Sequence, residues 1–222
     1  ISGFHALISS GTTPKMVQKE GQTLFVGYGS MLMESLVGVM ALITAVTLTP
    51  GEYFSINMGG LGSDINLALP KIQAVLDRIN ASGFNFTITA EQLEALRNGV
   101  GEENMLSRTG GAPTFALGLA LLFQEVFGGL AMMPYWYHFA ILFEALFILT
   151  AVDAGTRTCR FMIQDILGNV YKPAGNSNNL FWALIATFIG VAGWGWLLYA
   201  GVNDPMGGIY TLWALFGASN QM

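Results

Sequence analysis

Three stretches of the chain are apolar over about twenty residues, the length of a helix that crosses the roughly 30 Å hydrocarbon core of a bilayer. They run over residues 27–48, 135–152 and 180–202. The first two contain one carboxylic acid each, Glu34 and Glu144. This pattern predicts an all-α integral membrane protein with three full spans.

Two further apolar pieces are shorter. The piece over 112–130 contains Gln124 and Glu125 and breaks at Gly128-Gly129, and a second piece runs over 208–218 to the chain end. Short cytoplasmic loops carry the excess of Lys and Arg. These residues precede the first span and separate the second span from the third, which puts both regions on the cytoplasmic side. The piece over 112–130 is then expected to dip into the membrane or lie along its outer face, with a full crossing that violates the charge rule as the alternative.

The segment over 49–111 is expected to be an extracytoplasmic loop with two short helices, over 69–80 and 90–98. In the first helix the apolar positions recur at helical spacing, which predicts a single buried stripe. The stripe consists of Leu69, Ile72, Val75, Leu76 and Ile79. The expected organisation therefore begins with a broken helix and the first span over 1–48, followed by the outer loop over 49–111 and the re-entrant or surface helix over 112–134. Residues 135–222 are expected to form two spans and the start of a last helix, with a cytoplasmic loop over 153–179.

Composition supports a membrane protein and excludes other classes. The 222 residues are 53% hydrophobic and only 10% charged, whereas an ordinary soluble domain has about 25% charged residues. With a net charge of −5 and no basic cluster, a nucleic-acid partner is not expected. The single cysteine, Cys159, excludes an internal disulfide framework, and it has no zinc-type spacing with the histidines. No metal or cofactor is predicted. Because the chain begins at Ile1 and ends in an apolar stretch, it is expected to be a fragment.

Small and hydroxyl-bearing residues replace the expected apolar helix over 2–14. In a bilayer, irregular backbone is tolerated where it is buried in protein or lines a watery cavity, and interrupted helices form the substrate sites of transporters. An ordinary cytoplasmic loop that ends at Pro14-Lys15 is the alternative. The candidate substrate-binding residues are Ser2, Gly3, His5, Ser9, Ser10, Gly11 and Thr12.

Four other residues are candidates for proton or charge chemistry. An unpaired carboxylate at the centre of a span costs at least about 2.5–3.5 kcal/mol, so Glu144 is a candidate for proton coupling, with a neutral acid bonded between helices as the alternative. Glu34 is the second candidate, nearer the cytoplasmic end of its span. Asp153 and Arg157 are four residues apart with the acid first, which favours a helical ion pair at a gate or helix end. His138 is assigned to an interfacial aromatic belt.

Five segments, in order, resemble the carbon starvation protein A family. They are SGFHALISSGTTPK at 2–15, GYGSMLMES at 27–35, WYHFAILFEALFILTAVDAGTR at 136–157, RFMIQDILGN at 160–169 and GIYTLWALFGASNQM at 208–222. The resemblance implies a LeuT-like core of two inverted five-helix repeats, of the amino acid-polyamine-organocation superfamily. Residues 2–13 would be the unwound part of its sixth helix, and 112–130 the outer helix between the seventh and eighth. The chain departs from the family at Trp213, where Ala214 replaces an expected proline.

The family's function supplies the leading hypothesis. It implies a multi-pass protein of the inner (plasma) membrane that imports pyruvate or small peptides during carbon starvation, by proton symport and alternating access. The expected partners are the substrate, a coupling proton, the bilayer and the rest of the transporter chain, with a small accessory protein as a further candidate. A passive channel or structural membrane subunit is the alternative function. An enzyme is not expected.

Overall fold

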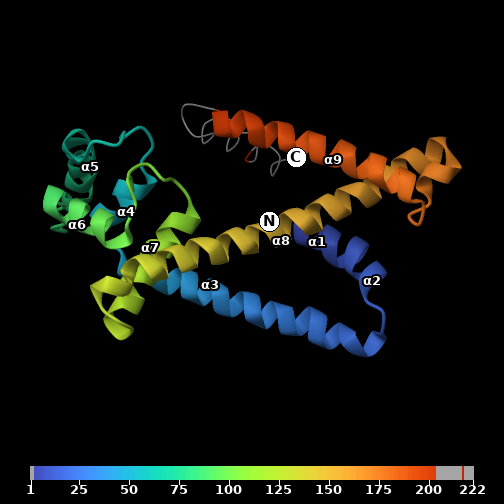
Figure 1. Cartoon of the computed structure of the whole chain (residues 1–222), viewed down its shortest axis with the longest axis horizontal. Helices are drawn as coiled ribbons and strands as arrows, with labels where there is room; N and C mark the ends of the chain where they lie inside the picture. Colours follow the sequence, from blue (N-terminus) through green and yellow to red (C-terminus); the bar gives the residue numbers. More distant parts are fainter. Residues whose placement is uncertain (1–2, 204–216, 218–222) are drawn as a thin grey trace. The chain divides into compact units, whose positions relative to one another are not determined.

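The computed structural model describes residues 3–203 and residue 217, and all regular elements of this part of the chain are helical (Figure 1). The chain forms two compact units, one of residues 1–30 and 147–222 and the other of residues 31–146. The helices are α1 Gly3–Leu7, η1 Ile8–Thr12, α2 Thr13–Met16, η2 Glu20–Gln22, η3 Leu24–Gly29, α3 Ser30–Thr47, α4 Pro50–Asn57, α5 Ile65–Asn80, α6 Ala90–Val100, α7 Gly111–Val126, η4 Leu130–Met132, α8 Met133–Val170, η5 Lys172–Gly175 and α9 Leu180–Asn203.

Three of the helical stretches are long and apolar enough to cross a membrane. They cover Glu20–Thr47, Leu130–Val170 and Leu180–Asn203. The three predicted spans fall within them almost entirely, which confirms the all-helical fold and the three membrane-compatible helices. The predicted piece over 208–218 lies, apart from residue 217, outside the described residues.

Helix α8 is much longer than the span predicted for it. Its 38 residues extend about 57 Å at 1.5 Å per residue, and a hydrocarbon core is roughly 30 Å thick. The predicted span ends at residue 152, but the helix continues through Asp153, Arg157 and Arg160 to Val170. It ends shortly before Pro173, because the residue before a proline is disfavoured in the α conformation. Only residues 171–179 lie between α8 and α9, so most of the expected loop over 153–179 is helix.

The unit of residues 31–146 contains a small helical domain formed by α4, α5 and α6. Helix α5 starts at Ile65 with the Asp64 side chain as its N-cap, four residues before the predicted start, and α6 starts with a capping box of Thr89 and Gln92. Both short helices predicted in the segment over 49–111 are confirmed. The apolar stripe of α5 faces the core of this domain, with Ile72 and Leu76 fully buried.

Helix α7 lies in the core of the same unit. Residues 114–120 are all buried, and they form a cluster with Leu48, Val100 and Met133. With 16 residues it is about 24 Å long, which is shorter than the roughly 30 Å of a hydrocarbon core. This length agrees with the prediction that the piece over 112–130 does not cross the membrane. That it does not cross remains a prediction. The helix does not lie on the surface of this unit, because other parts of the unit cover residues 114–120.

The closest contact of α7 is made by Gly118. A Cβ atom added there would overlap the carbonyl oxygen of Thr44 and lie 2.8 Å from the Thr44 Cβ, so the backbones of α7 and α3 can approach this closely only at a glycine. Small residues have this role in many membrane helix interfaces. The contact sets the position of α7 against α3 within the unit.

We predict that Gly118→Ala destabilises the protein by about 1–3 kcal/mol, the usual cost of overpacking where a backbone cannot move aside. Thermal unfolding of the purified full-length protein in detergent measures the effect. The matched control is Gly111→Ala, at the first position of α7, where an added Cβ meets no atom within 4 Å. Equal melting temperatures for the two variants would contradict the close packing of α7 on α3.

Candidate functional site

The N-terminal segment is helical throughout, which corrects the expected unwound stretch. Residues Gly3–Leu7 and Thr13–Met16 are α-helical, and Ile8–Thr12 between them form a single π-helical turn. The turn contains the small residues that suggested a break. It replaces the α-helical pattern of hydrogen bonds with a π-helical one, so the backbone is not unwound. π-Helical turns are rare and often mark functional sites. Ser2 lies outside the described residues.

The hydroxyls of the π turn are bonded to the helix itself. Ser9 Oγ donates to Ala6 O at 3.1 Å and Ser10 Oγ donates to the same oxygen at 2.7 Å, so the two hydroxyls share one carbonyl as acceptor. Both side chains are exposed, as is Gly11, beside which an added Cβ would meet no atom within 4 Å. His5 is also exposed. Each of these two exposed hydroxyls can therefore leave the Ala6 carbonyl and donate to a different acceptor.

Thr12 connects the π turn to α8 through a buried pair of hydroxyls. Its Oγ1 lies 2.8 Å from Thr158 Oγ1, and the two residues are 4% and 8% exposed. Thr158 Oγ1 also donates to Ala154 O at 3.0 Å. Because a hydroxyl has one proton, Thr158 acts as donor to its own helix and Thr12 donates to Thr158. The buried Thr12 hydroxyl therefore has Thr158 as its acceptor.

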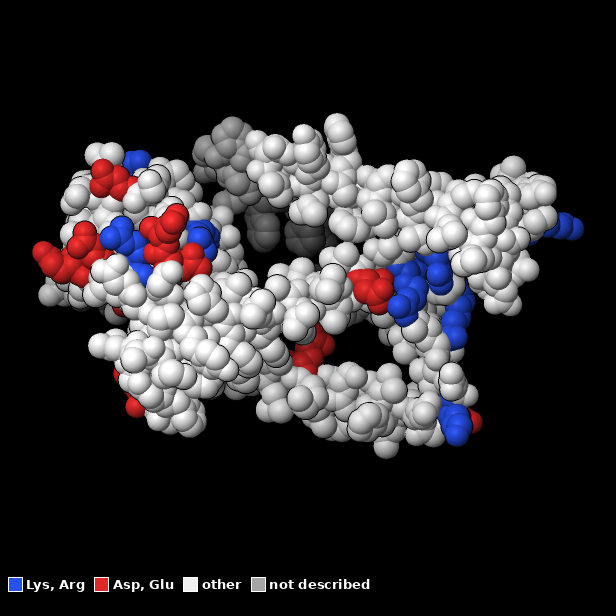
Figure 2. All heavy atoms as spheres, viewed as in Figure 1, with Lys and Arg blue, Asp and Glu red and all other residues white. Residues whose placement is uncertain are grey.

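Cations surround the contact between α2 and α8. Arg157 donates to Asp153 Oδ2 at 2.9 Å, as the spacing predicted, and its second terminal nitrogen lies 2.9 Å from Met16 Sδ. Lys15 Nζ lies 4.8 Å from the centre of the Phe161 ring. Figure 2 shows Lys and Arg gathered where α2 meets the C-terminal half of α8. The pair of Asp153 and Arg157 thus forms part of a basic surface where the end of α2 meets the middle of α8. Because α8 continues to Val170, the predicted position of the pair at a helix end is wrong.

The two acidic candidates belong to the other unit. Glu34 lies on α3 with an exposed side chain, and Glu144 lies on α8 with a half-buried one. His138, assigned from the sequence to an aromatic belt, faces Glu102: its Nδ1 lies 3.9 Å from Glu102 Oε1, and Glu102 Oε2 accepts a bond of 2.9 Å from Arg108. Of the candidate site residues, Thr12 and Arg157 have partners on α8 within one unit. Among the described residues, Glu34 and Glu144 form neither a hydrogen bond nor an ion pair through their side chains.

An apolar groove lies between α8 and α9 in the first unit. It encloses about 790 Å³ and is lined mainly by aliphatic side chains and by glycines, among them Gly155, Gly190 and Gly193. Cys159 lines it as well, and its Sγ would lie 3.2 Å from a Cβ at Gly190, so the thiol packs on a helix backbone. The groove suits apolar side chains and offers little to a charged solute.

Comparison with known proteins identifies the family. The model described as carbon starvation protein CstA matches residues 1–222. The chain belongs to this family. The order of segments quoted from the sequence had indicated the same group.

Curated members of the CstA family align along the entire chain. The chain is 61% identical over 225 residues to the peptide transporter CstA of Campylobacter jejuni, 51% identical over 225 residues to that of Escherichia coli, and 48% identical over 237 residues to the pyruvate/proton symporter BtsT of Escherichia coli. It spans 31% of the length of the first two relatives and 33% of the third. No solved structure matches it.

Sequence reasoning missed the partner residues in this CstA-family chain. Thr158 and Glu102 carry no pattern that separates them from other surface or loop residues. Thr158 lies in TRTCR, and only the packing of α2 and η1 on α8 shows that Thr12 reaches it. Glu102 follows the helix end at Gly101, whose positive φ of 74° turns the chain. The spacing of Glu102, Arg108 and His138 along the chain gave no signal.

We predict that Thr158→Val lowers the free energy of unfolding by about 1–3 kcal/mol, because the buried Thr12 hydroxyl then lacks an acceptor. Thr12→Val is expected to cost less, since Thr158 still donates to Ala154. Thermal unfolding of the two single variants and the double variant measures the coupling, with Thr12→Ser as the control that keeps the hydroxyl. If Thr12→Ser destabilised as much as Thr12→Val, the hydroxyl pair would not be the stabilising contact.

Proposed function

We propose that this chain is part of a secondary transporter that imports pyruvate or small peptides, coupled to protons, during carbon starvation. The observation that carries the proposal is the alignment of all 222 residues with relatives named as peptide transporters and as a pyruvate/proton symporter. Both substrates present a carboxylate. The interrupted N-terminal helix with its paired hydroxyls supports a role in solute binding.

The proposed fold is a LeuT-like inverted-repeat core in the inner membrane, crossed several times. In it, α1 to α2 belong to the sixth helix, and the three long helices are the seventh, eighth and ninth. The basic surface of Lys15, Arg157 and Arg160 then lies on the cytoplasmic side, as the distribution of Lys and Arg along short loops favours. The domain of α4, α5 and α6 lies outside, and α7 does not cross.

The proposed substrate contact is the π turn. A carboxylate accepts hydrogen bonds only, so it requires donors. Ser9 and Ser10 share the Ala6 carbonyl as acceptor, and either hydroxyl can rotate toward a carboxylate while the other keeps the bond. Gly3, His5, Gly11 and Thr12 remain candidate contacts, as does Ser2. Thr12 acts in this scheme by holding the turn on α8, where Thr158 accepts its proton.

The proposed coupling residue is Glu144, with Glu34 as the second candidate. Each carboxyl lies on a helix long and apolar enough to cross a membrane. A carboxylate within hydrocarbon is costly, so each is stable there when neutral or when facing water or a partner. Exchange between these two conditions during transport would bind and release a proton. Asp153 and Arg157 are proposed to close the cytoplasmic end.

Uptake into proteoliposomes that contain the full-length protein tests the function. Labelled pyruvate and a labelled dipeptide are supplied with and without an inward proton gradient, and accumulation of either solute above equilibrium only with the gradient is expected. Equilibration that ignores the gradient would replace the proposal with a passive channel.

We expect Glu144→Gln to abolish proton-driven accumulation while counterflow exchange of the same solute continues, because the amide cannot carry the proton. Glu34→Gln is measured beside it. Glu20→Gln is the control, since Glu20 is an exposed carboxylate at the start of η2. Unchanged accumulation by Glu144→Gln would remove that residue from the coupling mechanism.

A further inference from the structure

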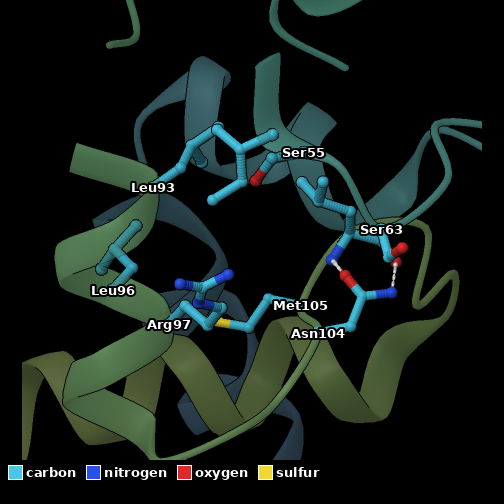
Figure 3. A pocket seen from close by; sticks show the side chains of 9 residues that line it. Ser55, Ser63, Leu93, Leu96, Arg97, Asn104 and Met105 are labelled. Atoms are coloured by element: carbon cyan, nitrogen blue, oxygen red, sulfur yellow. Dashed lines mark hydrogen bonds between the residues drawn. The ribbon is translucent and has the colours of Figure 1, made fainter. Parts of the chain in front are cut away.

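A small pocket opens on the domain of α4, α5 and α6, in the unit of residues 31–146 (Figure 3). Helix α4 contributes Ser55, helix α6 contributes Leu93, Leu96 and Arg97, and the segment after α6 contributes Met105. The Arg97 side chain lies between those of Leu96 and Met105, with Ser55 on the opposite side (Figure 3). A cation is thus placed among apolar side chains.

Arg97 is half-buried and is not paired with an anion. In the part of the chain that the structure describes, its side chain makes neither an ion pair nor a hydrogen bond. Neighbouring cations of the domain are engaged, since Arg108 binds Glu102 and Lys71 donates to Gly60 O. A guanidinium that loses part of its water without gaining an anion is destabilised. An anion from outside the chain would supply the missing partner.

The other polar groups of the pocket are occupied by the chain itself. Ser55 Oγ donates to Glu52 O at 2.6 Å, and the Asn104 side chain bonds both the amide and the carbonyl of Leu106. Arg97 is therefore the donor available to a ligand there. Its planar fork matches the two oxygens of a carboxylate.

The size and charge of the surroundings limit the ligand. The enclosed space is about 10 Å³, which holds about one water, so a carboxylate would meet Arg97 at the mouth of the pocket and the rest of the ligand would stay outside. Acidic residues outnumber basic ones over 49–111, and Figure 2 shows acidic side chains over α5 and α6. Such a surface repels a dianion more strongly than a monoanion.

We propose that this pocket binds the carboxylate of a small solute through Arg97. The choice of solute rests on the proposed function, because pyruvate and a peptide both carry one carboxylate that fits the fork. The site is separate from the π turn, lies on the domain proposed to face outside, and raises the local concentration of substrate before transport.

Chemical protection tests the site directly. Phenylglyoxal modifies accessible arginines, and peptide mass spectrometry of the purified full-length protein gives the rate at Arg97, with the exposed Arg78 of α5 as the reference on the same molecules. Pyruvate and alanylalanine are expected to slow modification of Arg97 several-fold and leave Arg78 unchanged. Pyruvamide, which is neutral, is expected to protect neither.

Two results of this experiment would overturn the proposal. One is an Arg97 rate that pyruvate and alanylalanine leave unchanged. The other is equal protection by inorganic phosphate at the same concentration, which would make the pocket a general anion site. Protection of Arg97 in a protein that transports neither solute would support the pocket and contradict the proposed function, so the two failures are distinguishable.

Kinetics of uptake provide the second measurement. Arg97→Gln is expected to raise KM for pyruvate or the dipeptide about tenfold with the maximal rate unchanged, the effect of losing one charge-assisted contact in binding. Arg97→Lys is expected to restore part of the loss, and Arg78→Gln is the matched control with wild-type KM. A KM for Arg97→Gln within twofold of the wild-type value contradicts a role of the pocket in substrate capture.

Discussion

The structure depends on one constraint, which is that polar groups inside an apolar environment are costly without partners; among the described residues, few buried side-chain atoms lack one, chiefly the amide of Gln164. Backbone amides and carbonyls meet it by forming helices. The hydroxyls on these helices meet it in the same way: Ser35, Thr150 and Thr187 each donate to a carbonyl three or four residues earlier. Such bonds need no second helix, so a hydroxyl can sit on a lipid-facing or still uncovered surface at little cost.

Thr12 is the exception that connects two helices. Its hydroxyl bonds Thr158 instead of its own helix, and Thr158 in turn satisfies the rule through Ala154. The bond follows directly after the π turn, where Ser9 and Ser10 share one carbonyl. A segment with an interrupted bonding pattern is therefore attached at one end by a buried contact, while its preceding hydroxyls are exposed. This combination suits a part of the proposed transporter that moves about a held end.

Glycine makes the second kind of close contact, in each unit separately. Gly118 brings α7 against the backbone of α3 at Thr44, and Gly168 of α8 packs on Gly175, where a Cβ would lie 2.8 Å from the neighbouring Cα. Without a hydrophobic driving force between lipid-exposed helices, packing of this kind stabilises their association. The domain of α4, α5 and α6 relies on ordinary burial of apolar stripes, and among the described residues its one unpaired half-buried cation is Arg97.

The sequence alone determined the helical class, the three long apolar helices, the two short helices between the first and second of them, the family and the Asp153–Arg157 pair, because each rests on periodicity, spacing or segment order within a short stretch. It did not determine the π turn, since small residues weaken a helix without specifying which bonds replace those of the α form. It also did not show that the helix of the second span continues 18 residues past residue 152, because charged residues can extend a helix beyond its apolar part. The pairings of Thr12 with Thr158 and of Glu102 with His138, and the isolation of Arg97, were decided by tertiary structure, since they join residues that only packing brings together or keeps apart.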